Sequence, residues 1–307
     1  MTDIILHHYD LSPFAEKARL MFGIKGLAWK GVQIPLVMPK PDLMPLTGGY
    51  RRTPVMQIGA DIFCDTRLIA EELERRFDGP SLMAGGLGLA NVVSGFAEEK
   101  LFWAVAGLVV GTNADRFPMA FHEDRAKMRG GSGNVNLDKL KAASGMQVEQ
   151  LRPQLGWAAD LFRDGRSFLA GETAGLADLT LHHPLWFLKN SGGEAAAVLD
   201  DYPALPAFMA RVEAIGHGEM SEMSAAEALD VATNASPEAG RGVAANAEGW
   251  KAGDAMAVMP TDYARDPVVG ELTGYGGNAI TVLRNDDRVG AVAVHFPRVG
   301  YALRRAG

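Results

Sequence analysis

Three short stretches of the sequence place groups that can hold a small thiol or anion where a helix or strand begins. The first is Ser12-Pro13, which precedes a run with helical spacing of apolar residues. Serine is a favoured N-cap, and Pro13 loses nothing at the first helical position. A helix N-terminus favours negative charge and lowers the pKa of a thiol held there. Taken alone, Ser12 is more often a plain cap than a group that stabilises a thiolate.

The second and third stretches are Thr53-Pro54 and Asp65-Thr66. Pro54 begins a predicted edge strand, where the backbone groups of Thr53 are free to pair with an extended peptide. Asp65-Thr66 begins a second predicted helix and combines a carboxylate with free N–H groups. The carboxylate of Asp65 can bind an ammonium group, and the helix N-terminus can bind a carboxylate group. Together they match an amino-acid zwitterion. A plain N-cap is again the commoner explanation.

These stretches require a small mixed sheet with helices packed on it. Ile4–Leu6 is a continuous apolar run, typical of a strand buried on both faces. Glu16, Lys17 and Arg19 fall on the helix face opposite the apolar one, which is formed by Phe14, Ala18, Met21 and Phe22. The patterns predict the order β-α-β followed by β-β-α. After the first strand and helix, strands are predicted over residues 27–34, 55–58 and 62–64, and the last helix over 67–77.

From residue 87 to 216 the pattern changes to helix throughout. The predicted helices are Leu89–Gly111, Met119–Met128, Leu137–Arg163, Leu176–Asn190 and Leu205–Ile215. A sheet domain joined to a helical domain favours a site in the groove between them. Phe102, Trp103 and Phe121 are candidates to line that groove, although aromatic residues at helical spacing more often belong to a core.

The predicted secondary structure changes again in the last part of the chain. Residues 220–248 are predicted to be a loosely helical connector, and 253–305 contain four β-type runs separated by turn residues. Such a small β unit needs other surface to pack against. Its chemically suggestive side chains, Tyr275 and His295, are expected to serve in packing or on the surface. The predicted domains are therefore residues 1–79, 87–219 and 220–307.

Composition excludes several classes of function. The 307 residues carry 30 basic and 37 acidic side chains, a net charge of −7, so nucleic acid is not an expected partner. The single cysteine, Cys64, allows no intramolecular disulfide and is expected to be an inert buried thiol. No signal peptide, membrane span or metal-ligand cluster is predicted, and a cytoplasmic location is expected.

The order of Ser12-Pro13-Phe14, Thr53-Pro54-Val55 and Asp65-Thr66 resembles that of the cytosolic glutathione transferases. Residues 168–171, Leu176-Ala177-Asp178 and Tyr202-Pro203 are similar to the helical domain of that family. The resemblance covers residues 4–216. It implies an α/β thioredoxin-like N-terminal domain, an all-helical C-terminal domain and an additional small β-rich extension.

The resemblance also implies a role for each matching residue. Ser12 stands where serine-type members keep the hydroxyl that stabilises the glutathione thiolate, and Phe14 is expected near the thiol. Thr53 and the cis-proline Pro54 would pair with the cysteinyl unit. The remaining implied contacts are Asp65 and Thr66 with the γ-glutamyl end and Arg52 with the glycyl carboxylate. Tyr9 is an alternative activating hydroxyl, but its position fits the family less well than that of Ser12.

The sequence departs from the family at Gly175, where a Ser or Thr usually caps the helix that contains Asp178. Glycine is a tolerable cap, so weaker local stability is expected rather than another fold. The β extension is outside the family pattern.

The function that these features favour is a glutathione transferase that attacks a small apolar electrophile. Glutathione is then a co-substrate, no metal is needed, and a homodimer is expected from the family. Two alternatives stay open. One is a non-enzymatic binding or scaffold protein whose extension is the working surface. The other is a glutathione-dependent reductase of disulfides or peroxides at the same site.

Overall fold

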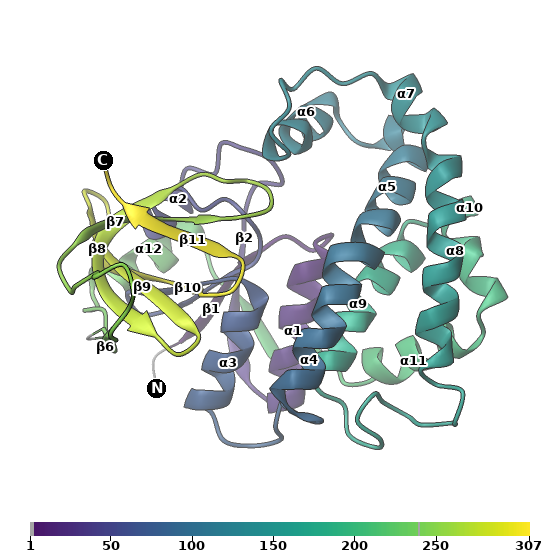
Figure 1. The fold of residues 1–307 in the computed structure, drawn as a ribbon, viewed down its shortest axis with the longest axis horizontal. Helices are drawn as coiled ribbons and strands as arrows, with labels where there is room; N and C mark the ends of the chain where they lie inside the picture. The colour runs from purple at the N-terminus through teal and green to yellow at the C-terminus, as the bar shows by residue number, and fades with distance from the viewer. Residues whose placement is uncertain (1–2, 239) are drawn as a thin grey trace.

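The structure is a computed structural model that describes residues 3–238 and 240–307. A mixed sheet forms one half of the molecule and a bundle of helices the other half (Figure 1). The strands are β1 (Ile4–His8), β2 (Ala28–Gln33), β3 (Val55–Ile58), β4 (Asp61–Cys64), β5 (Glu219–Glu222), β6 (Gly242–Val243), β7 (Ala255–Pro260), β8 (Val268–Gly276), β9 (Ala279–Asp286), β10 (Gly290–Pro297) and β11 (Tyr301–Arg305).

The N-terminal part has the predicted β-α-β-β-β-α order. Strand β1 pairs in parallel with β2 and antiparallel with β3, and β3 forms a hairpin with β4. Helix α1 (Pro13–Lys25) connects β1 to β2, and α3 (Thr66–Arg76) follows β4. A single helical turn, α2 (Met44–Thr47), lies in the proline-rich connection before β3. These elements form the thioredoxin-like unit that the sequence predicted.

Helix α1 begins and ends as its sequence dictates. Ser12 caps its N-terminus, Pro13 occupies the first position, and Gly26 ends it in the left-handed conformation at φ 61°. Its polar face is buried too: Glu16 and Lys17 are each almost fully covered. The reason is that α1 lies between the sheet and the helical bundle, where it packs on α9 (Leu176–Asn190).

The helical bundle contains the predicted helices with two corrections. The long helix predicted over 89–111 is α4 (Gly86–Phe96), a π-helical turn (Ala97–Leu101) and α5 (Phe102–Thr112). The helix predicted over 137–163 is α7 (Leu137–Ala142) followed by α8 (Ser144–Asp160). The remaining helices are α6 (Met119–Met128), α10 (Gly193–Ala197) and α11 (Ala204–Glu213). The residues at these breaks, 97–101 and Ala143, include no glycine or proline, which explains why the sequence pattern does not mark them.

The start of α9 shows why glycine replaces the expected cap. The carboxylate of Asp178 accepts hydrogen bonds from the backbone N–H of Leu169 at 2.7 Å and of Gly175 at 2.9 Å. A Cβ at position 175 would lie 2.8 Å from the Cβ of Ala84 and 3.0 Å from the carbonyl oxygen of Leu82. The close approach of this segment therefore requires glycine, and Asp178 still closes half of the capping box.

The extension continues the N-terminal sheet instead of forming a separate small unit. Strand β10 pairs in parallel with β4, so the order from one edge is β11-β7-β8-β9-β10-β4-β3-β1-β2-β5, with β6 on β8. The prediction of about four strands was too low, since Tyr301–Arg305 forms a fifth and Glu219–Glu222 pairs with β2 at the far edge. Of the predicted connector, Ala225–Thr233 is helix α12.

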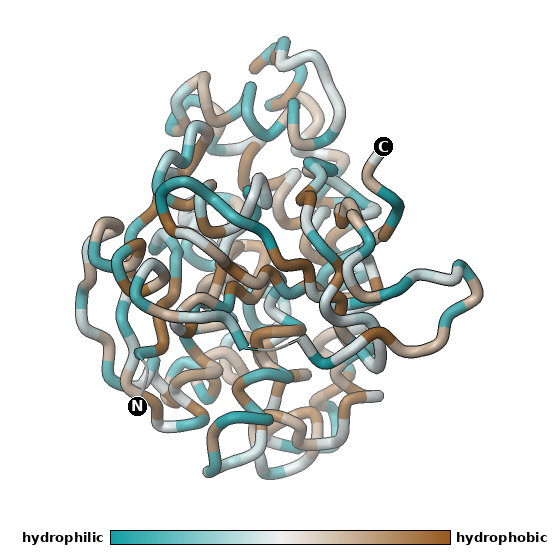
Figure 2. The backbone as a smooth tube through the Cα atoms, turned by 90° about the vertical axis from the view of Figure 1, so that its left-hand side faces the viewer, coloured by the Kyte–Doolittle hydropathy of each residue, from teal (hydrophilic) through white to brown (hydrophobic). Residues whose placement is uncertain are grey.

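A side-chain cluster around His295 and a shared apolar core both help to attach the extension to the N-terminal sheet. His295 of β10 lies 2.8 Å from a carboxylate oxygen of Asp61 and 3.0 Å from the hydroxyl of Thr281, and its ring stacks on Phe63. Apolar residues of β7–β11 share one core with Val55, Ile62 and Cys64. Figure 2 views the molecule from the left-hand side of Figure 1. In this view many apolar segments lie toward the middle, and hydrophilic loops lie around them. The expectation that His295 serves in packing is confirmed.

Within the described residues, no helix combines the length and apolar character that crossing a membrane requires.

Candidate functional site

The first predicted site residue, Ser12, lies at the N-terminus of α1 and is buried. Its backbone N–H bonds to the carbonyl of Tyr9, which turns the chain from β1 into the helix. The hydroxyl oxygen accepts a hydrogen bond from the N–H of Ala15 at 3.1 Å. Because the oxygen only accepts in this bond, its own proton is free to be donated to a neighbouring anion.

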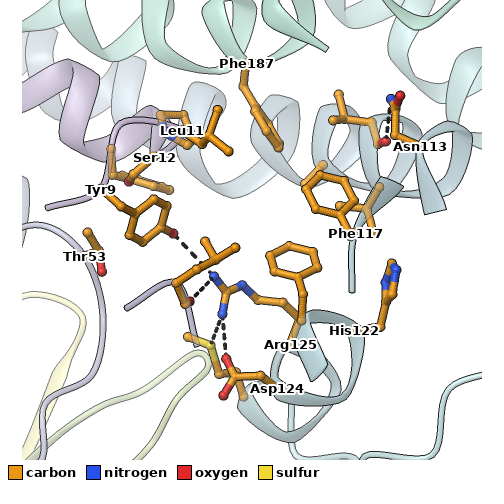
Figure 3. A pocket seen from close by; sticks show the side chains of 18 of the residues that line it. Tyr9, Leu11, Ser12, Thr53, Asn113, Phe117, His122, Asp124, Arg125 and Phe187 are labelled. Atoms are coloured by element: carbon orange, nitrogen blue, oxygen red, sulfur yellow. Dashed lines mark hydrogen bonds and ion pairs between the residues drawn. The ribbon is translucent and has the colours of Figure 1, made fainter. Parts of the chain in front are cut away.

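A cavity of about 510 Å³, here called the first cavity, opens beside Ser12 between the N-terminal sheet and the helical bundle. Its walls are mainly apolar, with Phe187 above and Phe117 toward one end (Figure 3). Phe102, Trp103 and Phe121 also line it, which confirms the groove predicted for these aromatic residues. A pocket of this kind suits an apolar molecule with few polar groups.

A second cavity, of about 470 Å³, adjoins the first. Phe14, Arg52 and Thr53 line both cavities. Pro54, Asp65 and Thr66 line the second one. All seven predicted site residues therefore line one or the other of two adjoining cavities, although they come from three separate segments of the chain. The Thr53-Pro54 peptide bond is cis.

Asp65 is held in an unusual conformation where α3 begins. Its φ is 77°, a left-handed value that non-glycine residues seldom adopt, and one carboxylate oxygen accepts from the N–H of Arg67 at 3.0 Å. The other carboxylate oxygen accepts from the hydroxyl of Tyr301 at 3.2 Å. Burial raises the pKa of Asp65, while the hydrogen bond from Arg67 opposes this rise. The carboxylate is thus fixed in the wall of the second cavity.

Arg52 is engaged by the extension. It forms an ion pair with Asp262 and donates to the carbonyl oxygen of Tyr263. Its guanidinium also lies over the ring of Tyr263, 3.8 Å from the centroid. Asp262 is more than half exposed, so this ion pair borders solvent. The extension therefore contributes directly to the second cavity, through Asp262, Tyr263 and Tyr301.

A buried charge cluster supports the floor of the second cavity. Glu98, in the π-helical turn, pairs with Lys17 at 2.8 Å and lies 3.4 Å from the ring of His183. Burial raises the pKa of Glu98, but Lys17 and His183 together outweigh it and hold the pKa of this carboxyl well below its usual range. Burial lowers the pKa of His183 to about 4. This cluster links α1, the π turn and α9.

Sequence reasoning missed several residues of the two cavities. Lys40, Arg51 and Arg125 form part of the wall of the first cavity, and Asp262 and Tyr301 form part of the second. None of them stands in a motif of defined spacing, and contacts distant in the sequence bring them together. Among the described residues, no group of three or more His, Cys, Asp and Glu is arranged to hold a metal ion.

Comparison with known proteins assigns the class. Residues 6–81 match the N-terminal domain of the glutathione S-transferases, and residues 125–215 match their C-terminal domain. The chain belongs to the glutathione S-transferase family, as the sequence resemblance predicted.

Among solved structures, a GST-like protein from Pseudomonas syringae is 37% identical, with a TM-score of 0.76 and all of each chain covered. The extension is thus shared with that protein. A glutathione S-transferase from Rhodospirillum rubrum is 21% identical, with a TM-score of 0.54 over 68% of this chain and 87% of that one. Poplar glutathione transferase F1 is 13% identical, with a TM-score of 0.54 over 70% of this chain and 97% of that chain. No curated protein matches the chain.

Proposed function

We propose that the protein is a glutathione transferase in which Ser12 stabilises the thiolate of glutathione. The observation that carries this proposal is the hydroxyl of Ser12, which accepts from Ala15 and keeps its own proton for the sulfur. The free N–H groups at the start of a 13-residue helix add favourable electrostatics. One such hydrogen bond and a helix terminus lower a thiol pKa by on the order of two units.

The second cavity then holds the rest of glutathione. Thr53 pairs its backbone with the cysteinyl unit, and Asp65 and Thr66 bind the γ-glutamyl end. Asp65 offers a fixed carboxylate for the ammonium group, and the N-terminus of α3 favours the α-carboxylate. Arg52 takes the glycyl carboxylate at a position where it already pairs with Asp262. Phe14 lies between the two cavities, next to the sulfur.

The first cavity holds the electrophile. Its apolar walls remove the acceptor from water and orient it toward the thiolate, so proximity supplies much of the acceleration. The thiolate sulfur forms the new bond to the electrophilic carbon as the bond from that carbon to its leaving group breaks, and the leaving group departs with the electron pair. The proton that the thiol lost on binding passes to water.

The test is ultraviolet difference absorbance on adding glutathione near neutral pH, which reports binding and thiolate formation together. A saturable thiolate signal is expected in the unaltered protein and should be lost in Ser12→Ala. The matched control is Ser224→Ala, which removes the N-cap of α12, a helix that lines neither cavity. Absence of the signal at millimolar glutathione, or an equal signal in Ser12→Ala, would overturn the proposal.

We also propose a homodimer, on the basis of family membership. Light scattering coupled to size-exclusion chromatography should give twice the 32.8 kDa mass of the chain. A monomeric mass would contradict it.

A further inference from the structure

The two cavities meet at a junction to which the extension contributes a side chain. The residues that line both cavities, here called the junction, are Phe14, Arg52, Thr53, Phe102, Trp103 and Tyr263. Thr53 lies on the same side of the first cavity as Ser12, away from Phe117 (Figure 3). The proposed function puts the sulfur of glutathione next to Phe14, at this junction. Tyr263 of the extension is therefore a neighbour of the place where the sulfur meets the electrophile.

Tyr263 is held in place by its backbone and by its ring. Arg52 donates to its carbonyl oxygen, and the N–H of the next residue, Ala264, donates to the carbonyl of Met128 in α6 at 2.7 Å. The ring lies under the guanidinium of Arg52, 3.8 Å from the ring centre, and meets the ring of Trp103 edge-on with 5.3 Å between centroids. The loop is thus attached to both the thioredoxin-like unit and the helical bundle, and the phenol has a fixed position at the junction.

The hydroxyl of Tyr263 is free to bind a ligand. Within the part of the chain that the structure describes it forms no hydrogen bond, and it is not among the polar atoms sealed in the interior without a partner. The residue is half-buried and lines both cavities. Other tyrosine hydroxyls of the site are engaged. Those of Tyr50 and Tyr301 share a hydrogen bond, and that of Tyr9 accepts from Arg125.

This hydroxyl acts as a donor at neutral pH. Burial raises the pKa of Tyr263 to about 12, and Asp262 and Asp65 add to the rise while Arg52 opposes it. The phenol therefore keeps its proton. In a cavity with mainly apolar walls, a fixed O–H donor stabilises an oxygen that becomes negative more strongly than it would in water. Because such a bond strengthens as the charge develops, it lowers the barrier of the reaction and not only the free energy of binding.

We propose that Tyr263 is a catalytic residue that donates a hydrogen bond to the carbonyl oxygen of the electrophile, and that the electrophile is an α,β-unsaturated carbonyl compound with an apolar body. This inference rests on the proposed transferase function and names a residue and an acceptor class for the same site. The thiolate sulfur bonds to the β-carbon, the electron pair of the carbon–carbon double bond shifts, and the carbonyl oxygen becomes an enolate oxygen that Tyr263 stabilises. The α-carbon then takes a proton from water and the carbonyl re-forms. No leaving group departs, in contrast to a displacement.

This acceptor class fits the lining of the junction. One neutral O–H donor suits an uncharged oxygen, and the aromatic walls suit an apolar body. In a conjugated carbonyl the attacked carbon and the oxygen that gains charge are different atoms. The sulfur, held beside Ser12, and the phenol of Tyr263 can therefore act on one molecule from different segments of the chain. An alkyl halide has no oxygen and would leave this hydroxyl unused.

Two electrophiles that share a phenyl ring test the catalytic role. Benzylideneacetone has the conjugated carbonyl, whereas benzyl chloride has none and reacts by displacement of chloride. Tyr263→Phe removes the hydroxyl and keeps the ring against Arg52 and Trp103. In this variant the ratio of kcat/KM for benzylideneacetone to kcat/KM for benzyl chloride should fall by at least about tenfold, since loss of one such donor typically costs about a hundredfold. An unchanged ratio would overturn the inference, because a merely structural loss affects both electrophiles alike.

The matched control is Tyr275→Phe. It removes another phenol hydroxyl of the extension, which accepts from Arg298 and belongs to a residue that lines neither cavity. The ratio of the two kcat/KM values should be the same in this variant as in the unaltered protein. A fall in the ratio as large as that of Tyr263→Phe would mean that the extension acts through its stability and that the inference is wrong.

Infrared spectroscopy tests the contact without turnover. Benzylideneacetone is bound alone or together with S-methylglutathione, whose blocked sulfur cannot attack it. The carbonyl stretch of the bound ketone should lie at a lower frequency in the unaltered protein than in Tyr263→Phe, because a hydrogen bond to the oxygen weakens the C=O bond. Equal frequencies in the two proteins would overturn the inference.

The same measurements separate this inference from the proposed function and from a role in binding glutathione. A thiolate signal with equal carbonyl frequencies would contradict this inference alone. A shifted carbonyl frequency without a thiolate signal would contradict the proposed function alone. If Tyr263→Phe raises KM for glutathione and leaves the ratio of the two electrophiles unchanged, the hydroxyl binds glutathione and the inference is wrong.

Discussion

Tyr301, in the last strand, donates a hydrogen bond from its hydroxyl to the Asp65 carboxylate at 3.2 Å. It also shares a hydrogen bond with the hydroxyl of Tyr50 at 3.1 Å. The extension thereby fixes a group at the N-terminus of α3 that lines the second cavity. The wall of this cavity is built jointly by the thioredoxin-like unit and by the final strand of the chain.

We expect Tyr301→Phe to lower the free energy of unfolding by about 2 kcal/mol, because the hydroxyl of Tyr50 and one carboxylate oxygen of Asp65 each lose a hydrogen bond. Urea denaturation measures this change. The control is Tyr275→Phe, which removes an exposed hydroxyl that accepts from Arg298, and its effect should stay below about 0.5 kcal/mol. Equal losses in the two variants would contradict a special role for the contact with Asp65.

A thiol placed at position 12 should be unusually acidic. In Ser12→Cys we expect the introduced thiol to have a pKa at least about one unit below the usual value, because the N-terminus of α1 stabilises a thiolate. The pH dependence of alkylation by iodoacetamide measures it.

The unaltered protein is the control for that experiment. Its single thiol, Cys64, is fully buried, and burial raises the pKa of this thiol well above the ordinary value. It should therefore react slowly throughout the pH range. An ordinary or raised pKa for the introduced thiol would show that the helix terminus does not act on the group at position 12.

The part of the site that the sequence predicted depends on local signals. Ser12-Pro13 and Asp65-Thr66 were recognisable because helix caps are encoded within a few residues, and Asp65 does accept from Arg67, two positions later. The isomer of Thr53-Pro54 needed the family resemblance, since position alone favours trans.

The missed part depends on pairings between distant segments. The apolar run of β10 fits a parallel or an antiparallel neighbour equally well, so nothing local indicated that Val294 lies opposite Ile62 of β4. The pairing of β10 with β4 places the extension so that Asp262 pairs with Arg52 and Tyr301 donates to Asp65. Lys40 and Arg125 likewise line one cavity, although Arg125 belongs to the helical domain. Charge alone did not distinguish these residues from surface cations.

Binding of an anionic ligand in the first cavity should weaken as pH rises through about 7. The pKa of Lys40 is lowered to about 7, with burial as the largest cause and Arg125 and Arg51 next, so Lys40 is mostly charged at pH about 6 and mostly neutral at about 8. The neighbouring Asp124 opposes this shift. Affinity for dinitrobenzoate should therefore fall several-fold over this range, as fluorescence titration at each pH measures.

Two comparisons show whether Lys40 causes this dependence. The methyl ester of dinitrobenzoate has no charge and should bind equally at both pH values. Lys40→Met should bind the acid more weakly at pH about 6 and lose the dependence between about 6 and 8. The same slope in Lys40→Met and in the unaltered protein would assign the titration to another group.

Restoring the usual capping residue before α9 should destabilise the protein. Gly175→Ser supplies a hydroxyl that ordinarily contributes about 1 kcal/mol at an N-cap. Its Cβ, however, would lie 2.8 Å from Ala84 and 3.0 Å from the carbonyl of Leu82, so the chain has to shift. Overpacking of this kind costs about 1–3 kcal/mol, which exceeds the gain. Urea denaturation should show a lower free energy of unfolding.

Gly175→Ala separates the two contributions, because it introduces the same Cβ without the hydroxyl and should be less stable than Gly175→Ser. Ala84→Gly combined with Gly175→Ser should recover part of the loss, since it removes the nearest atom. A more stable Gly175→Ser would mean that the segment from Leu82 to Ala84 moves aside at little cost. Position 175 would then be glycine for a reason other than packing, whereas the expected loss would show that the approach of this segment to α9 excludes the family's usual cap.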